Sequence, residues 1–355
     1  MAVPNDIIFF HYSYSPYARR VLWYLALRGI PYAQCIQPPV LPRPDIAGLG
    51  IAHRRIPIMA IGRDVYADTR LILKKLEARY PQGALGARDP EQKLMEELLA
   101  RWTIDGNLFS HAAGLIPLHL PNMNNPVFLK DRGDFSGKPW DRDMIERARP
   151  ENAVTMREAF RLMETTVLSD GRDWVLKTEK PTLADIEGKR KTKSGPQSVR
   201  SCPGLVLTCH SAIWLYHWLI DMKGALPPDS ISEEQFPRVF AWVSRFRAAL
   251  KASRATSPNP VTLEGEDAIK HVLAADFAEK EGEIDKADPL GLEKGMEVEV
   301  WPLDTGAAHS DRGRLIALTP DEVVLEIKSK VTEGEVRFHV PRRGFRVVKV
   351  KDERL

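Results

Sequence analysis

The sequence predicts an α/β domain at the start of the chain, then an all-helical domain, then a small all-β barrel-like module. In the first 82 residues, short apolar runs alternate with stretches of helical period, whereas residues 90–253 have helical period alone. Residues 293–355 instead alternate polar and apolar side chains in five short segments. A chain of 355 residues is long enough for two domains and a module.

The composition indicates a folded chain and gives no sign of a nucleic-acid or membrane partner. Hydrophobic residues make up 43% of the sequence, and 51 basic against 48 acidic residues leave a formal net charge of +3. Three cysteines do not suggest a disulfide framework. Because the N-terminus lacks the features of a signal peptide and no long apolar run occurs, we expect a cytoplasmic protein.

The first elements are predicted as strand, helix and strand. Ile7–Phe10 is a short apolar run typical of a buried strand, and Tyr32–Ile36 is the next such run. Between them, Ser15 is a favourable N-cap, Pro16 suits the first helical position, and Gly29 ends the helical stripe. A strand, helix and strand in this order indicate a right-handed βαβ unit with parallel strands.

A hairpin and a helix are predicted next. Ile56–Ile61 and Asp64–Tyr66 flank a Gly-Arg turn, which indicates two antiparallel strands. Asp68 then caps a helix that ends near Tyr80. The order βαβ then ββα fills residues 1–82, which we predict to be one domain.

The remaining boundaries follow from changes in pattern. Residues 90–253 are predicted to form the all-helical domain, and residues 254–292 a linker with one helix at Ala268–Phe277. Residues 293–355 are predicted to form a small barrel-like module of five strands, which we interpret as an interaction or covering module.

Residues 188–212 form an anomalous insert within the helical domain. Residues 188–210 carry five basic and no acidic side chains and have no helical period. Our hypothesis is a retained intron translated in frame, because Gly188-Lys189 can encode a splice donor and Ser211-Ala212 an acceptor. The alternative is a genuine solvated loop.

Four motifs carry a resemblance to a known family. They are Ser15-Pro16-Tyr17-Ala18-Arg19-Arg20-Val21, Arg55-Ile56-Pro57-Ile58, Ala67-Asp68-Thr69-Arg70-Leu71-Ile72 and Pro181-Thr182-Leu183-Ala184-Asp185-Ile186. In this order and spacing the sequence resembles cytosolic glutathione transferases of the serine type, and it is most similar to fungal glutathione transferase-like proteins. The resemblance covers residues 5–250 and implies a thioredoxin-like first domain and a glutathione transferase helical domain.

Ser15 is the candidate catalytic residue. A thiol needs a hydroxyl donor and a helix N-terminus to be held as its thiolate, and an N-cap serine offers both. Tyr12 is the alternative donor, since other classes of the family use a tyrosine after the first strand. An ordinary helix cap is the simpler interpretation of Ser15 taken alone.

The resemblance also implies a glutathione-binding set. Pro57 would be a cis proline that presents the backbone of Ile56 to the peptide. Asp68 and Thr69 would hold the γ-glutamyl end at a helix N-terminus, although Asp replaces the usual Glu and is one methylene shorter. Arg55 would face the glycyl carboxylate. The complete set is Pro16, Tyr17, Arg55, Ile56, Pro57, Asp68 and Thr69.

The electrophile pocket is predicted from helical-domain residues that follow the first domain. The candidates are Trp102, Asp105, Phe109 and His111. Aromatic residues in such helices are more often core than pocket, and a histidine is more often a satisfied polar group than a catalyst. No spacing of residues suggests a metal site, so no metal is expected. The resemblance implies glutathione as co-substrate.

These observations predict an enzyme that activates the glutathione thiol for addition to a small electrophile, or for its isomerisation or elimination. The role would lie in detoxification or secondary metabolism. Two alternatives are a non-catalytic scaffold of the same fold and a glutathione-independent biosynthetic isomerase or cyclase. The expected partner is a small molecule, with no nucleic acid and no membrane, and the resemblance leaves a homodimer open.

Overall fold

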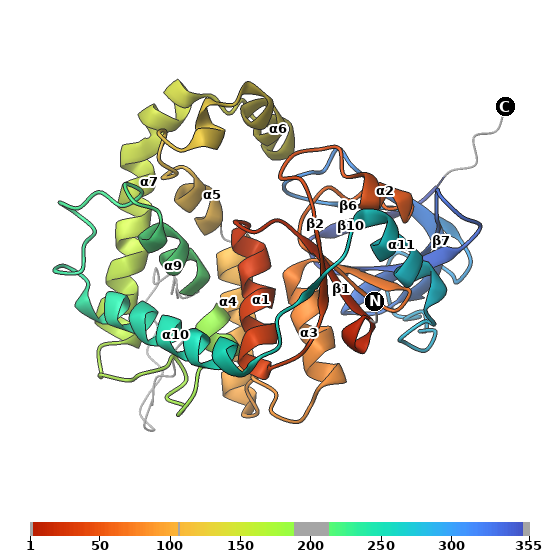
Figure 1. Cartoon of the computed structure of the whole chain (residues 1–355), viewed down its shortest axis with the longest axis horizontal. Helices are drawn as coiled ribbons and strands as arrows, with labels where there is room; N and C mark the ends of the chain where they lie inside the picture. Colours follow the sequence, from red (N-terminus) through yellow and green to blue (C-terminus); the bar gives the residue numbers. More distant parts are fainter. Residues whose placement is uncertain (1–2, 106, 188–212, 351–355) are drawn as a thin grey trace. The chain divides into compact units, whose positions relative to one another are not determined.

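The computed structural model describes residues 3–105, 107–187 and 213–350. The chain divides into two compact units (Figure 1). Unit 1 contains residues 1–79, 125–141 and 256–355, and unit 2 contains residues 80–124 and 142–255. No helix among the described residues is long and apolar enough to cross a membrane.

Unit 1 is built on a sheet of ten strands in the order β10-β6-β7-β8-β9-β4-β3-β1-β2-β5. The strands are β1 (Ile7–His11), β2 (Ala33–Ile36), β3 (Ile58–Ile61), β4 (Asp64–Ala67), β5 (Val261–Thr262), β6 (Glu297–Pro302), β7 (Asp311–Leu318), β8 (Glu322–Lys328), β9 (Glu335–Pro341) and β10 (Phe345–Lys349). Its helices are η1 (Pro4–Asp6), α1 (Pro16–Arg28), α2 (Pro44–Gly48), α3 (Thr69–Arg79), α6 (Pro126–Ser136) and α11 (Gly265–Ala274).

The elements predicted for the start of the chain are confirmed. β1 and β2 are parallel, and β3 pairs antiparallel with both β1 and β4. The amide of Ala18 donates to the Ser15 hydroxyl, which makes Ser15 the N-cap of α1. Gly29 ends α1 with φ +59°, a left-handed conformation that favours glycine. Local caps and periodicity therefore suffice to define these elements.

Alternating side chains of β1 separate the two faces of the sheet. Ile8 and Phe10 belong to a core cluster that includes Ile46 of α2 and Val272 of α11. Ile7 and Phe9, which alternate with them along β1, are also buried but do not belong to this cluster. α2 packs against α11, and α1 packs against α3 on the opposite side of the sheet (Figure 1).

The C-terminal strands differ from the expected separate barrel. β6 to β9 form an antiparallel meander, and β10 pairs with β6. β9 then pairs in parallel with β4, through the register Asp64↔Arg337 to Tyr66↔His339. The five predicted strands thus exist, but they extend the first sheet. Among the described strands, β10 and β5 are the two edge strands of this open sheet.

Residues 254–292 also differ from the expected linker. β5 pairs in parallel with β2, and α11 contributes Ala268 and Val272 to the core beneath the sheet. The helix begins at Gly265 rather than Ala268. Turn-rich composition suggested a linker, but the apolar face of this helix is buried against α2, so the segment is an integral part of unit 1.

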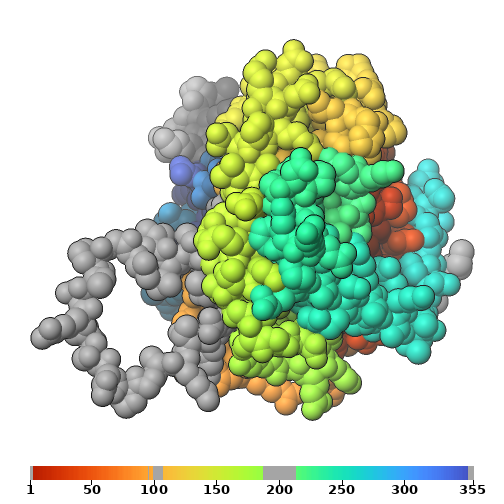
Figure 2. Space-filling view, turned by 90° about the vertical axis from the view of Figure 1, so that its left-hand side faces the viewer, coloured from red at the N-terminus to blue at the C-terminus, as the bar shows by residue number. Residues whose placement is uncertain are grey.

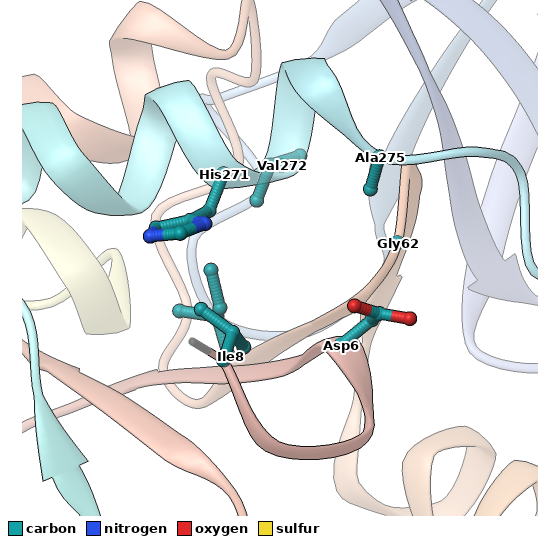
Figure 3. Close-up of a pocket in the computed structure, with 7 residues that line it drawn as sticks. Asp6, Ile8, Gly62, His271, Val272 and Ala275 are labelled. Atoms are coloured by element: carbon teal, nitrogen blue, oxygen red, sulfur yellow. The ribbon is translucent and has the colours of Figure 1, made fainter. Parts of the chain in front are cut away.

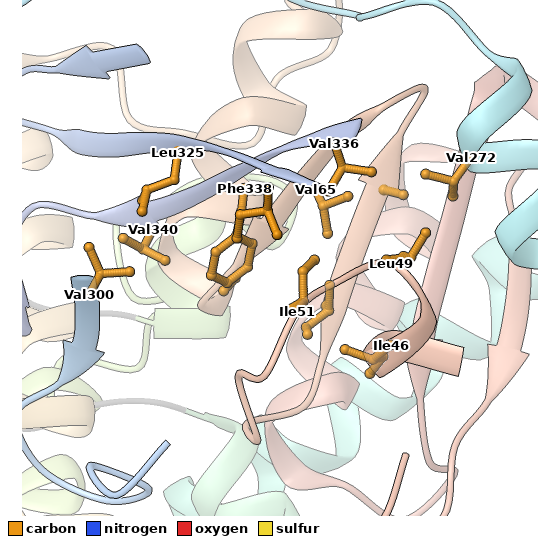
Figure 4. Close-up of a cluster of buried hydrophobic side chains, with 14 of the residues drawn as sticks. Ile46, Leu49, Ile51, Val65, Val272, Val300, Leu325, Val336, Phe338 and Val340 are labelled. Carbon is orange, nitrogen blue, oxygen red and sulfur yellow. The ribbon is translucent and has the colours of Figure 1, made fainter. Parts of the chain in front are cut away.

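One continuous hydrophobic cluster joins the two halves of unit 1. Val65 of β4 and Ile51 lie beside Val336 and Phe338 of β9 (Figure 4). Leu325 of β8 belongs to the same cluster. Because residues from the first hairpin and from the C-terminal strands bury one another, the last strands stabilise the first domain.

Unit 2 is helical in its described residues. Its elements are α4 (Pro90–Asp105), α5 (Leu108–Ala113), η2 (Pro121–Asn124), α7 (Arg142–Leu162), the π-helical turn η3 (Met163–Val167), α8 (Leu183–Glu187), α9 (Ile213–Asp221) and α10 (Pro237–Thr256). Figure 2 shows the yellow-green residues of α7 beside the green residues of α10. The carboxylate of Glu164 in η3 accepts hydrogen bonds from the amides of Arg238 and Val239 at the start of α10.

Hydrogen bonds between Thr182 and Asp185 define the start of α8. The amide and hydroxyl of Thr182 donate to the Asp185 carboxylate at 2.9 and 3.0 Å. Asp185 also accepts from the Val175 amide and from Nε1 of Trp242, at 2.8 and 3.2 Å. The insert at 188–212 follows this helix, and the retained-intron hypothesis concerns residues outside the described part of the structure.

Candidate functional site

Ser15 begins the candidate site at the N-terminus of α1. Its Oγ lies 3.2 Å from the amide nitrogen of Ala18, and its side chain is buried. Because the hydroxyl oxygen accepts that bond, its proton is available to a further acceptor. Pro16 follows at the first helical position and is also buried. The first turn of α1 thus combines a hydroxyl donor with the positive end of a thirteen-residue helix.

Tyr12, the alternative donor, lies in the loop before Ser15. Its carbonyl accepts a hydrogen bond from the Ser15 amide at 3.1 Å, and its ring centroid lies 4.9 Å from that of Tyr14. Tyr12 is half-buried, and Tyr14 is exposed. The loop therefore places a phenol and the Ser15 hydroxyl three residues apart in the chain.

The Ile56–Pro57 peptide bond is cis, as the resemblance implies. These residues come just before β3, outside its ladder. The preceding segment is held by β7, since the Ala52 amide donates to Oδ1 of Asp311 at 2.6 Å. Burial raises the pKa of Asp311 to about 7, against the opposing effect of the amides it accepts from. The C-terminal strands thus help to position the cis proline.

Asp68 and Thr69 form the N-terminal end of α3. Asp68 has φ +70°, a left-handed conformation that is uncommon for a non-glycine residue and is concentrated at functional sites. Its two carboxylate oxygens accept from Nε and Nη2 of Arg70 at 3.0 and 2.8 Å. Burial opposes the charged form, but Arg70 holds the pKa of Asp68 well below its usual range.

Arg20 joins α1 to this corner. Its Nη1 donates to the hydroxyl of Thr69, and the whole side chain is inaccessible to solvent. Burial lowers the pKa of Arg20 to about 10, and the charge of Asp68 works in the opposite direction. The group still carries its charge at neutral pH, so the N-terminus of α3 is electropositive.

Tyr17 lies among the charged residues predicted for glutathione binding. The charges of Arg20, Arg55, Asp304 and Asp68 all act on its phenol. Burial raises the pKa of Tyr17, so it remains a neutral hydroxyl. The structure therefore brings together the residues predicted from α1, from the segment before β3 and from α3, and adds Asp304, which the sequence analysis missed.

The partners of Arg55 come from the loop between β6 and β7. Its Nη2 forms an ion pair with Asp304, and its Nε and Nη2 donate to the carbonyl of Thr305 at 2.9 and 2.6 Å. Arg55 and Asp304 are 249 residues apart in sequence, and no local pattern links them. Sequence reasoning had no signal for this contact.

The structure describes the side chains of two of the four predicted pocket residues. Trp102 and Asp105 belong to α4, and their side chains lie outside the described part of the structure. The ring of Phe109 stacks on that of Trp218 at 5.7 Å between centroids. Nδ1 of His111 lies 2.9 Å from Oδ1 of Asn152. Phe109 and His111 are both half-buried, Phe109 in aromatic packing and His111 with a polar partner.

A small cavity lies elsewhere in unit 1. It has a volume of about 20 Å³, and Figure 3 shows His271 and Val272 of α11 on one side, with Asp6 and Ile8 on the other. This is room for about one water molecule, so the cavity does not accommodate a substrate.

One group of potential metal ligands occurs among the described residues. Ligand atoms of Glu279, Glu322 and His339 lie within 4.8 Å of one another. Nζ of Lys75 contacts both glutamates, at 2.6 and 2.7 Å. The two nitrogens of His339 face Glu322 and Asp64 at 3.1 and 2.9 Å. Lys75 and His339 thus pair with these carboxylates, so the chain's own side chains already form an ion network here.

Two family models match the chain. The model described as the glutathione S-transferase N-terminal domain matches residues 9–84. The model described as a domain of unknown function (DUF7962) matches residues 111–191 and 195–255. The first match contains all residues predicted to bind glutathione, from Pro16 to Thr69.

The chain is also similar to individual proteins. Glutathione S-transferase U1 of Arabidopsis thaliana is 25% identical over 91 residues, which are 26% of this chain and 41% of that protein. The chain therefore matches about two fifths of the length of this curated relative. A GST-like protein from Pseudomonas syringae superposes with a TM-score of 0.65 and 22% identity, over 98% of this chain and all of the other. The chain has a glutathione S-transferase-like fold.

The Pseudomonas syringae structure covers nearly the whole glutathione S-transferase-like chain, so the fold likeness includes the C-terminal strands. A glutathione S-transferase from Methylobacterium radiotolerans, solved in complex with glutathione sulfonate, has a TM-score of 0.44 and 18% identity. It covers 72% of this chain and 96% of that chain.

Proposed function

We propose that this chain binds glutathione and activates its thiol at Ser15 for addition to a small electrophile, or for isomerisation or elimination of that substrate. The observation that carries the proposal is the hydrogen bond from Arg20 of α1 to Thr69, next to Asp68 at the N-terminus of α3, with the charges of Arg20, Arg55 and Asp68 all acting on the phenol of Tyr17. Arg20 belongs to the helix that Ser15 caps.

The chemistry of the thiol supports Ser15 as the donor. A thiolate is the reactive form, and it is favoured by a hydroxyl donor and by the partial positive charge at a helix N-terminus. The hydroxyl proton of Ser15 has no role in capping, because the cap uses its oxygen as an acceptor. Donation of that proton to the ligand sulfur leaves α1 intact.

The N-terminus of α3 suits the γ-glutamyl end. The first amides of this eleven-residue helix and the charge of Arg20 favour a carboxylate, whereas Asp68 favours an ammonium. A tripeptide laid against Ile56 beside cis-Pro57 would extend from this end toward Arg55. The proposed contacts are therefore Asp68 and Thr69 for the γ-glutamyl end, the backbone of Ile56 for the cysteinyl residue and Arg55 for the glycyl carboxylate.

Calorimetric titration of the full chain with glutathione tests this function, combined with ultraviolet absorbance of the bound thiolate. We expect saturable binding and a thiolate band at neutral pH. Ser15→Ala removes that band, whereas Ser13→Ala, at the exposed serine of the same loop, leaves it unchanged. Tyr12→Phe, with Tyr14→Phe as its control, tests the alternative donor. A folded chain that shows no saturable binding contradicts the proposal.

A non-catalytic scaffold is the second candidate function. It is favoured by the partners that the chain itself supplies to the proposed ligand contacts, since Asp68 pairs with Arg70 and Arg55 with Asp304. A glutathione-independent isomerase or cyclase is consistent with the same contacts. Loss of glutathione binding in a folded chain would favour these two functions.

The finer attributes belong to the same proposal. They are the serine-type and fungal-like subtype, a cytoplasmic location, a role in detoxification or secondary metabolism, and a homodimeric state. Glutathione is the proposed co-substrate, with no metal, and a small electrophile is the proposed partner.

A further inference from the structure

The loop between β6 and β7, residues 303–310, places a carboxylate on Arg55. Asp304 forms an ion pair with Nη2 of Arg55, and the Thr305 carbonyl accepts from Nε and Nη2 at 2.9 and 2.6 Å. The Arg55 side chain is 17% exposed and that of Asp304 is 58% exposed. Asp304 therefore lies at the solvent side of a mostly buried guanidinium.

The loop has anchors other than Arg55. The Leu303 amide donates to the carbonyl of Gly344 at 2.9 Å, and the Gly306 amide donates to that of Phe135 in α6 at 2.8 Å. Gly306 has φ +73°, and a Cβ there would lie 3.0 Å from Cγ of Arg54. Because the backbone is held on both sides of Asp304, the carboxylate is presented to Arg55 by the fold.

Neighbouring basic residues do not substitute for Arg55. Nη2 of Arg54 pairs with Oδ1 of Asp131 at 2.9 Å, and the Arg54 side chain is only 3% exposed. His53 is buried between Phe338 and Phe345, and burial lowers its pKa to about 3, so the ring is neutral. Within the described residues 53–55, Arg55 is the cation that an incoming ligand can reach.

A ligand carboxylate at Arg55 meets the negative charge of Asp304 at the same guanidinium. Repulsion between like charges is a means of selecting against one ligand while another is accepted. An ester or amide in the same place would meet no such repulsion and would still accept a hydrogen bond from Arg55.

We propose that Asp304 is a specificity-determining residue, which makes this site prefer γ-glutamyl thiols with an uncharged C-terminal group over those that end in a carboxylate. The proposal rests on the function proposed above. In this arrangement Asp304 is the internal counter-ion of Arg55, and the loop between β6 and β7 determines which thiol binds more tightly.

The test compares glutathione with its glycyl monoethyl ester by calorimetric titration of the full chain. We expect the wild-type chain to bind the ester about tenfold more tightly, which corresponds to about 1.4 kcal/mol. Asp304→Asn and Asp304→Ala abolish this preference because glutathione binding becomes stronger. Asp321→Asn, which removes an exposed aspartate paired with Lys74, leaves the preference unchanged.

Two results would overturn the proposal in different ways. If the wild-type chain binds both thiols and prefers glutathione, or if both Asp304 variants retain the wild-type ratio, Asp304 does not determine specificity, although the proposed function stands. If a folded chain binds neither thiol in any variant, the proposed function itself fails and the specificity proposal fails with it.

Discussion

Nε2 of His339 in β9 lies 2.9 Å from Oδ1 of Asp64 in β4. This contact joins a strand near the end of the chain to the first hairpin. Asp64 also accepts hydrogen bonds from the amides of Ala278 and Glu279 at 2.6 and 2.9 Å. One carboxylate thus connects three segments of unit 1, and its environment leads to the first prediction.

We predict that the free energy of unfolding depends on pH through His339 and Glu322. Burial lowers the pKa of His339, but Asp64 and Glu322 outweigh it and the net shift is upward. Burial raises the pKa of Glu322, but His339 and Lys75 outweigh it and lower that pKa to about 2. The stabilisation from His339 is complete below about pH 6.5 and is lost as pH rises through its raised pKa.

Glu322 sets the lower pH limit, since its contribution to the free energy of unfolding is complete above about pH 4.5 and is lost as pH falls toward 2. The contribution of this ion network to the urea midpoint should therefore be largest between about pH 4.5 and 6.5. The difference in midpoint between the wild-type chain and His339→Gln should be greatest in this range and should shrink above it. A difference that stays constant above this range would show that His339 does not contribute to the pH dependence.

Phe338→Ala should destabilise unit 1 by about 3 to 5 kcal/mol, because this ring is fully buried in the cluster that both halves of the sheet share. Hydrogen exchange should show lost protection in β1 and β3 as well as in β8 and β9. Val331→Ala, at an exposed position, should change stability by less than about 0.5 kcal/mol. Loss confined to the C-terminal strands would mean that they fold independently.

Asp185→Ala should destabilise unit 2 by about 3 kcal/mol, because the amides of Val175 and Thr182 and Nε1 of Trp242 lose their acceptor. Asp185→Asn keeps one acceptor oxygen and should lose about half as much. Thermal unfolding followed by tryptophan fluorescence measures both variants. Equal losses would show that the charge of Asp185, rather than its acceptor oxygens, is essential.

Asp68→Ala should destabilise unit 1 by about 2 to 3 kcal/mol, because it removes the partner of Arg70 and leaves alanine at φ +70°. Asp68→Asn should lose only about 1 kcal/mol, since asparagine tolerates the left-handed conformation and keeps an oxygen for Arg70. Urea unfolding distinguishes the two variants. If they are equally stable, the backbone conformation at this position is not a source of strain.

Much of the first 82 residues is predictable because its signals are local. Ser15 and Pro16 begin a helix and Gly29 ends it, through contacts within a few residues. Further along the chain, the hydrogen bonds between Thr182 and Asp185 have the same short range. The proposed ligand contacts of Ile56, Pro57, Asp68 and Thr69 come from motifs of the same short range. The proposed pocket residues Phe109 and His111 rest on no such motif, and their role stays a prediction.

By itself the sequence determined the four strands and two long helices of the first 82 residues, the five C-terminal strands, and the residues proposed here to bind a thiol. Only the tertiary structure decided that β9 lies beside β4, that α11 covers the sheet, and that Asp304 meets Arg55. Helix caps and apolar periodicity involve residues that are close in the chain, so they can be recognised in the sequence. Strand neighbours and long-range ion pairs depend instead on which arrangement buries the most apolar surface while satisfying every polar group, and that is a property of the whole unit.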